Sequence, residues 1–148
     1  MAKRKYEMKT ERSLKMNEEG LLQLRSIILA PYMQLATALI GKARHAGGNM
    51  FRHQMDTLAI LIDYGYIDPI LLKASIVHDT IEDIPGFDHD LVKNADSDGA
   101  EVYDLVMEVT KREGEDKKDF LMRIINNGSQ KAKVLKCADR ISNMISLG

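Results

Sequence analysis

Apolar residues recur at helical spacing along most of the chain, and this pattern predicts an all-α fold. Between residues 20 and 45 the apolar positions repeat every three to four residues, as they do on one face of a helix. Pro31 interrupts this run, and proline suits the first turn of a helix better than its interior. We therefore expect a short helix that ends near Leu29 and a longer one from about Pro31 to about Ala43.

Further helices are expected between residues that break or cap them. Gly65 is a typical helix stop, and Asp68 and Pro69 are the residue types favoured at the cap and first position of a new helix. Similar reasoning divides the rest of the chain, which brings the total to about eight helices. The later segments are His53–Tyr64, Ile70–Thr80, Asp88–Asn94, Ser97–Val109, Lys117–Ile125 and Ser129–Leu147.

The composition agrees with an all-α chain that forms one domain. Leu, Ile, Ala and Met supply most of the apolar surface, aromatic residues make up 5% and Trp is absent, so the runs typical of strands are missing. A length of 148 residues fits one domain with its own core. We expect a basic N-terminal tail at residues 1–16, which is either frayed and solvated or a contact for phosphate-rich partners. The domain then covers residues 17–148.

Charge and cysteine content exclude several classes of protein. The net charge of -1 and the 29% of charged residues are ordinary for a soluble globular protein, and they exclude a disordered chain or one that binds nucleic acid through bulk charge. A single Cys excludes a disulfide framework, so a cytoplasmic location is expected. The longest uncharged stretch, from Ser26 up to Lys42, is broken by Pro31 and falls short of a membrane span. The charged first residues argue against a secretory signal peptide.

Four ionisable side chains gather at the end of an apolar helix. His78, Asp79, Glu82 and Asp83 follow the apolar run that ends at Val77. Because burying such groups without partners is costly, they either pair with one another at a capped helix end or bind a cation. Imidazole suits Zn, Fe or Mn, and carboxylates shift the preference toward harder ions such as Mn.

The last helix carries a second group of candidates. Asp139 and Asn143 are four residues apart and therefore share a helix face. Asp139 can supply a further oxygen ligand to a metal, and Asn143 can point at a bound substrate. The alternatives are a solvated polar face or a surface pair between Asp139 and Arg140.

Together these motifs resemble a known family. The chain resembles the hydrolase domain of the RelA/SpoT family, which belongs to the HD metal-dependent phosphohydrolase superfamily, over about residues 35 to 148. The order and spacing of several separate motifs agree with the family pattern. The motifs are Gly41-x-x-Arg44-x-x-Gly47, His53, His78-Asp79-x-x-Glu82-Asp83, Val109-Thr110-Lys111 and Ala138-Asp139-Arg140-x-x-Asn143-Met144.

The resemblance implies a compact HD-type helical bundle with one metal ion, usually Mn²⁺, although another divalent ion would also suit. The implied metal ligands are His53, His78, Asp79 and Asp139. The resemblance also implies that Glu82 and Asp83 lie beside the reacting water and assist its attack. Arg44 would meet the substrate near its phosphates and Asn143 would contact the nucleotide. Lys111 lies in a basic cluster, which is either a solvated face or a contact for phosphates or RNA.

The implied activity is a Mn-dependent 3′-pyrophosphohydrolase of the stringent response, which converts ppGpp or pppGpp to GDP or GTP and pyrophosphate. The expected partner is thus a small nucleotide, no membrane partner is expected, and a homo-oligomer stays open. Since the chain has no room for a synthetase domain, we expect a stand-alone small alarmone hydrolase or an isolated hydrolase fragment.

Several positions depart from the family pattern and keep two alternatives open. Gln54 replaces the family Pro, Met50 replaces a Tyr, His45 lies where Lys is common, and Asp98 replaces a Phe. These changes and the basic tail favour, as one alternative, a related hydrolase that acts on ppApp, on NADPH or, like an antitoxin, on pyrophosphorylated tRNA ends. The other alternative is a non-catalytic nucleotide-sensing domain that has kept the fold.

Overall fold

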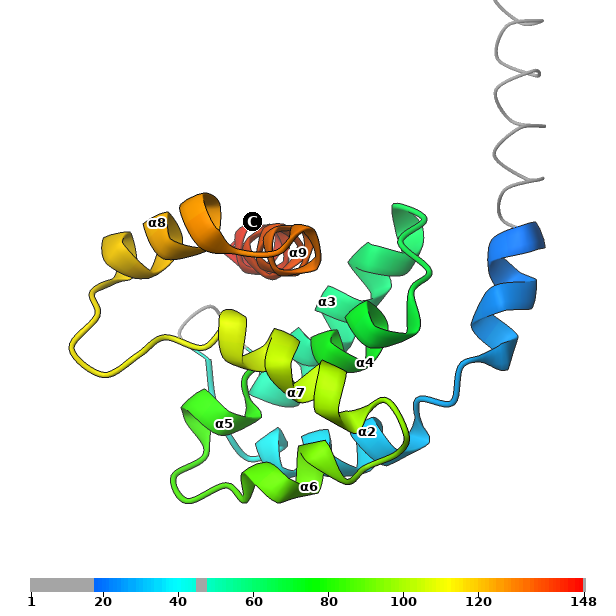
Figure 1. The fold of residues 1–148 in the computed structure, drawn as a ribbon, viewed down its shortest axis with the longest axis horizontal. Helices are drawn as coiled ribbons and strands as arrows, with labels where there is room; N and C mark the ends of the chain where they lie inside the picture. Colours follow the sequence, from blue (N-terminus) through cyan, green and yellow to red (C-terminus); the bar gives the residue numbers. More distant parts are fainter. Residues whose placement is uncertain (1–17, 45–47, 148) are drawn as a thin grey trace, which may run out of the picture.

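A computed structural model describes residues 18–44 and 48–147, and the regular elements in these ranges are helices (Figure 1). Within the same ranges, extended pairing is limited to one isolated bridge between Ala43 and Asn49. The all-α class predicted from the sequence is therefore confirmed. The basic tail predicted at residues 1–16 and His45 lie outside the described residues.

The elements follow one another with short connections. Residues 18–26 form the first described helix. The later elements are α2 (Ala30–Ala36), the 3₁₀ helix η1 (Thr37–Leu39), α3 (Met50–Asp63), α4 (Pro69–Val77), α5 (Thr80–Asp83), α6 (His89–Lys93), α7 (Gly99–Glu108), α8 (Lys117–Asn127) and α9 (Gln130–Leu147).

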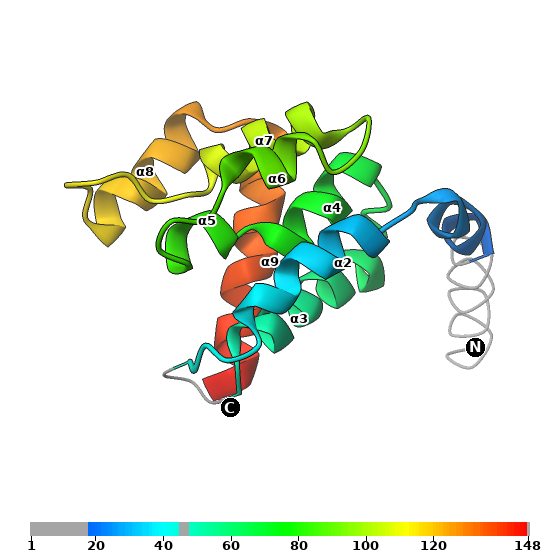
Figure 2. The same ribbon diagram turned by 90° about the horizontal axis from the view of Figure 1, so that it is seen from below.

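Helix α4 lies at the centre of the bundle and is covered by α2, α3, α7 and α9 (Figure 2). Every residue from Leu71 to Val77 is buried, in agreement with an apolar surface around nearly the whole helix. The buried charge of Lys73 is balanced by Asp96 and Asp98, whose carboxylates lie 2.8 and 2.7 Å from its Nζ atom. The buried ammonium group at the centre of the fold is thus paired with two carboxylates.

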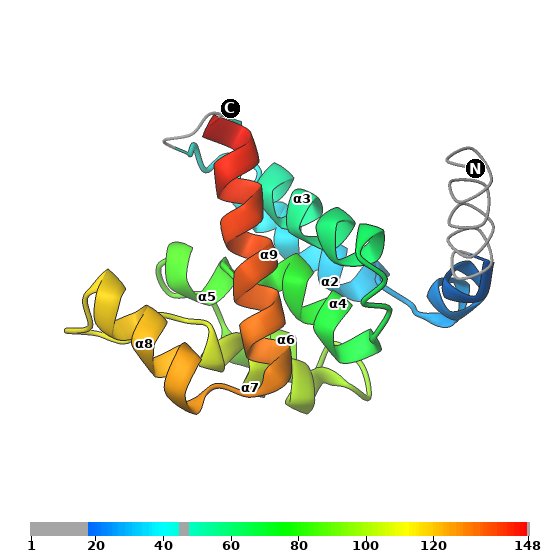
Figure 3. The ribbon, with the colours of Figure 1, turned by 90° about the horizontal axis from the view of Figure 1, so that it is seen from above.

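Helix α9, the longest in the part of the chain that the structure describes, crosses α3 and the end of α4 (Figure 3). This crossing brings the first turns of α3, the carboxyl end of α4 and the middle of α9 close together, although they lie far apart in the sequence. No helix among the described residues is long and apolar enough to cross a membrane.

The helix predicted from about Pro31 to about Ala43 is shorter in the structure. Helix α2 ends at Ala36 and η1 ends at Leu39. The backbone then turns back on itself, because the N–H of Met50 donates to the carbonyl of Lys42 at 2.8 Å. Gly48 has a φ of 73°, a left-handed conformation that glycine adopts at little cost, which allows this return.

The helix predicted from Ile70 to about Thr80 also ends early, at Val77. Nδ1 of His78 donates to the carbonyl of Ser75 at 2.7 Å, and the hydroxyl of Thr80 donates to the carbonyl of Val77 at 2.8 Å. These side chains take up carbonyls that a continuing helix would bond to backbone amides. The break places His78 and Asp79 at the junction between α4 and α5.

Candidate metal centre

Four side chains from three parts of the bundle converge on one point. His53 comes from the first turn of α3, His78 and Asp79 from the α4–α5 junction, and Asp139 from the middle of α9. One ligand atom from each of these residues lies within 4.8 Å of the others. The four residues that the resemblance implies as metal ligands are thus brought together.

The distances between facing atoms suit a single small cation. Nε2 of His53 is 2.7 Å from Oδ1 of Asp139 and 3.4 Å from Oδ2 of Asp79. Nε2 of His78 is 3.2 and 3.1 Å from the same two oxygens. Ligands bound at about 2.0–2.2 Å from one ion lie about 3 Å apart, so little movement would be needed to admit one.

The other ring nitrogens of the two histidines are held by groups outside the cluster. Nδ1 of His78 lies 2.7 Å from the carbonyl of Ser75, which can only accept a hydrogen bond. Nδ1 of His53 lies 2.9 Å from the hydroxyl of Ser142, which can accept one. In the neutral rings this arrangement leaves the lone pair on Nε2, the atom that faces the cluster, as in most metal-binding histidines.

Burial and charge set the protonation of this cluster. Burial alone would lower the pKa of His78, but the Asp79 and Asp139 carboxylates outweigh it and raise that pKa well above its usual value. Burial would likewise raise the pKa of Asp79 and Asp139, but the facing histidines lower the pKa of Asp79 and hold that of Asp139 well below the usual range. The two carboxylates therefore stay ionised, and a divalent cation would displace a proton from His78 as it binds.

Glu82 and Asp83 follow on α5, at the edge of the cluster. Desolvation on the protein side and the charges of Asp79 and Asp83 raise the pKa of Glu82 to about 7, although its outer side is exposed to solvent. Burial and the charge of Asp79 also raise the pKa of Asp83. A carboxylate that titrates near neutral pH beside candidate metal ligands suits a general base.

The three residues expected to contact substrate occupy two places. Nη2 of Arg44 donates to Oδ1 of Asn143 at 2.6 Å, so these two residues meet one helical turn beyond Asp139. The exposed Lys111 follows α7, and its main chain lies near enough to Glu82 to lower the pKa of that carboxyl. The pair of Arg44 and Asn143 therefore lies next to the cluster, and Lys111 lies next to Glu82.

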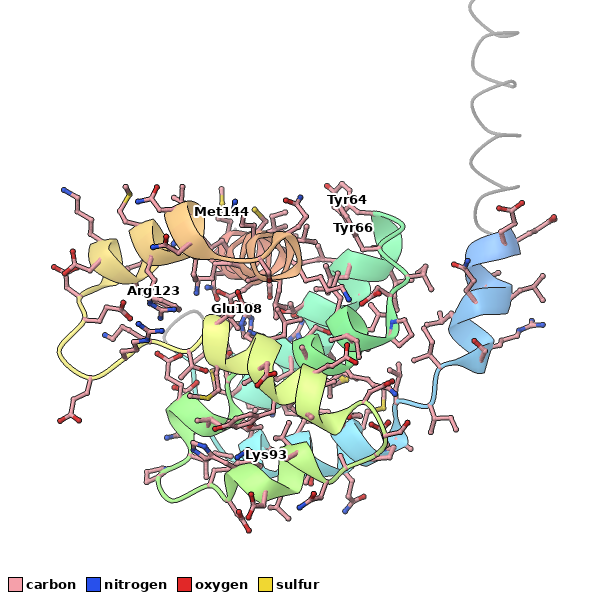
Figure 4. The ribbon with its side chains drawn as sticks, in the orientation of Figure 1. Tyr64, Tyr66, Lys93, Glu108, Arg123 and Met144 are labelled. Carbon is pink, nitrogen blue, oxygen red and sulfur yellow. The ribbon has the colours of Figure 1, made fainter. Side chains whose placement is uncertain are left out.

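The loop that carries Lys111 is held by one side chain from α8. Arg123 points from α8 toward the end of α7, near Glu108 (Figure 4). Its guanidinium donates to the carbonyls of Glu108 and Thr110, both at 3.0 Å, and pairs with Glu115 at 2.8 Å. This hydrogen bond from Arg123 is the main reason why the pKa of Glu115 falls to about 2.

Lys136 and Gln54, like Ser142, touch candidate ligands and were not assigned a role from the sequence. Lys136 donates to Oδ2 of Asp139 at 2.8 Å, and its Nζ atom lies 4.7 Å from the centre of the Phe120 ring. Gln54 is fully buried and bonds to Asp79. The spacing of Lys136, three residues before Asp139, was a usable signal. The sequence around Gln54 gave no sign of its bond to Asp79, because Asp79 lies at the α4–α5 junction, far from Gln54 in the sequence.

Comparison with known proteins adds no further evidence. No protein-family model matches the chain, and no curated protein matches it. The functional argument therefore depends on the residues and their geometry.

Proposed function

We propose that this chain is a metal-dependent phosphohydrolase of the RelA/SpoT type, whose reaction is the removal of the 3′-pyrophosphate from a guanosine alarmone. The observation that carries the proposal is the buried cluster of two imidazoles and two carboxylates beside a glutamate whose pKa is raised to about 7. Metal-assisted hydrolysis needs these two components, a cation site and a nearby base.

The donor set fits a divalent transition metal. Two imidazole nitrogens and two carboxylate oxygens suit Mn²⁺, Fe²⁺ or Zn²⁺, and the paired carboxylates favour the harder Mn²⁺. His53, His78, Asp79 and Asp139 would hold the ion. When bound, it would supply a nucleophile near neutral pH and offset the charge of the phosphoryl group.

The chain's own residues would perform the remaining tasks. Glu82 in its ionised form would accept a proton from water at the edge of the cluster, and Asp83 would help to orient that water. Arg44 would exchange its hydrogen bond with Asn143 for contact with substrate phosphates, where its fixed charge offsets theirs. Asn143 would then be released to contact the nucleotide.

The substrate assignment rests on the motif resemblance and has a direct test. Purified protein incubated with ppGpp and Mn²⁺ should release GDP and pyrophosphate. A parallel panel of pppGpp, ppApp, NADPH and tRNA with a 3′-terminal pyrophosphate would show whether another substrate is preferred. Absence of product from ppGpp with Mn²⁺, Fe²⁺, Zn²⁺, Co²⁺ or Mg²⁺ would contradict the proposed function.

Matched histidine variants provide the control for this assay. His78→Ala removes a candidate ligand and should abolish turnover. His89→Ala removes a histidine of α6 that bonds to Tyr103, outside the cluster, and should leave turnover unchanged. Circular dichroism of both variants checks that they are folded. Equal activity in the two variants would favour a non-catalytic role for the cluster.

A further inference from the structure

The side chain of Gln54 bridges two of the helices that supply candidate ligands. Gln54 lies on α3 directly after His53 and is fully buried. Its Nε2 atom donates to Oδ2 of Asp79 at 2.8 Å, and its Oε1 atom accepts from the backbone N–H of Asp79 at 3.3 Å. One side chain thus bonds to both the backbone and the carboxylate of Asp79.

The chemistry of the two partners fixes the orientation of this amide. The backbone N–H of Asp79 can only donate, so it must face Oε1, and an ionised carboxylate can only accept, so it must face Nε2. A rotated amide would place donor against donor and acceptor against acceptor. A glutamate would lack the donor, and a leucine or methionine would lack both groups.

The Asp79 oxygen that Gln54 holds is the one that faces the cluster. Oδ2 of Asp79 lies 3.1 Å from Nε2 of His78 and 3.4 Å from Nε2 of His53. Asp79 occupies the N-cap position of α5, but its side chain makes no capping hydrogen bond there. Its own helix therefore does not hold this carboxylate, and Gln54 does.

We propose that Gln54 is a positioning residue, which fixes Oδ2 of Asp79 as a metal ligand and keeps α3 in register with the α4–α5 junction. The inference rests on the proposed metal centre, and it concerns the affinity of that centre for its ion. Partners that hydrogen-bond to metal ligands orient them, and loss of such a partner typically lowers metal affinity by about 10- to 100-fold.

The test is Mn²⁺ binding to the purified protein, measured by isothermal titration calorimetry. Gln54→Met keeps the length of the side chain and loses both hydrogen bonds, so its Kd for Mn²⁺ should rise by about 10- to 100-fold. Thr57→Val is the matched control, because Thr57 is also buried on α3 and its hydroxyl bonds only to the carbonyl of His53. Its Kd should stay within about threefold of the wild-type value, well below the loss expected at Gln54.

A second variant covers the case in which Gln54→Met does not fold. Gln54→Asn keeps a polar amide but is one methylene too short to reach both partners, so it should also weaken Mn²⁺ binding. The electron paramagnetic resonance spectrum of bound Mn²⁺ should change in either variant, because one ligand loses its fixed orientation. A purely structural role would lower the melting temperature and leave both the Kd and the spectrum unchanged.

The outcomes separate this inference from the proposed function. If the wild-type protein binds no divalent ion, the metal centre itself is wrong. If the wild-type protein binds Mn²⁺ and the folded Gln54 variants bind it equally well, the positioning role of Gln54 is wrong while the metal centre stands.

Discussion

Glu82 is the residue whose environment contributes most to the proposed chemistry. An isolated glutamate is ionised at pH 7, whereas desolvation and the charges of Asp79 and Asp83 raise the pKa of Glu82 to about 7. Lys136 and the main-chain amide of Lys111 act in the opposite direction. The balance keeps the carboxylate close to the point at which it can either accept or release a proton.

This pKa predicts the pH dependence of turnover. With Mn²⁺ at saturation, kcat/KM, which reports the protein before substrate binds, should rise with pH on an acid limb with an apparent pKa no higher than about 7, because a bound cation lowers the pKa of Glu82. Glu82→Gln should lower kcat by about 10²- to 10⁴-fold and remove this limb. A pH–rate profile of both proteins tests this, and a fully active Glu82→Gln variant would exclude Glu82 as the base.

The same shift predicts how stability depends on pH in metal-free protein. The folded protein binds the Glu82 proton more tightly than the unfolded chain does, so protonation of Glu82 stabilises the folded state. This stabilisation is complete below pH 4.5 and is lost as pH rises through about 7. Glu82→Gln cannot lose a proton, so relative to wild type it should be more stable at pH 8 than at pH 5. Melting temperatures measured with a chelator at both pH values test the sign. A difference that is independent of pH would contradict it.

Single residues also show how far the site was predictable from the sequence. His53, His78, Asp79 and Asp139 are identified by motif spacing, and the structure brings them together. The sequence could not reveal that Gln54 bonds to Asp79 or that Arg44 bonds to Asn143, because each contact joins different parts of the fold. Local spacing carries no information on such pairs.

At the scale of the elements, the loop after α7 depends on α8. Arg123 holds the carbonyls of Glu108 and Thr110 and pairs with Glu115, and this loop places the amide of Lys111 against Glu82. Helix α8 therefore acts on the site without contributing a candidate ligand.

Replacement of Arg123 tests this dependence. Arg123→Met should lower the melting temperature, because it leaves the carbonyls of Glu108 and Thr110 without this donor and removes the ion pair with Glu115. Lys118→Met, on the exposed face of the same helix, is the control and should change it little. Hydrogen exchange at the Lys111 amide should accelerate in Arg123→Met alone. Unchanged exchange would show that the loop is held by other contacts.

The boundaries of the elements were less predictable than their number. Asp68 and Pro69 start α4 as expected, because an N-cap and a first-turn proline act locally. At the early end of α4, the side chains of His78 and Thr80 bond to carbonyls three residues earlier. After η1 the chain turns back, and the N–H of Met50 donates to the carbonyl of Lys42. Helical periodicity registers neither kind of bond, so it overestimated both lengths.

At the scale of the whole molecule, the candidate metal centre links three separate parts of the bundle. Because α3, the α4–α5 junction and α9 each supply ligands, an ion bound there would favour the folded chain over the unfolded one. Ligand binding to the folded state alone stabilises it by about 2.7 kcal/mol at 100 times the Kd.

This linkage predicts a metal-dependent melting temperature. Each kcal/mol of added stability shifts the melting temperature of a domain of this size by roughly 2–4 °C. Mn²⁺ at 100 times its Kd should therefore raise the melting temperature by about 5–11 °C. Addition of a chelator should reverse the shift. Differential scanning calorimetry tests the expectation, which a melting temperature insensitive to every divalent ion would contradict.

The most direct test of the metal centre is the stoichiometry of Mn²⁺ bound to purified protein, determined by equilibrium dialysis and elemental analysis. We predict one ion per chain in the wild-type protein and in His89→Ala, and none at the same Mn²⁺ concentration in folded His78→Ala. Binding of one ion to all three proteins, or to none of them, would contradict a centre formed by His53, His78, Asp79 and Asp139.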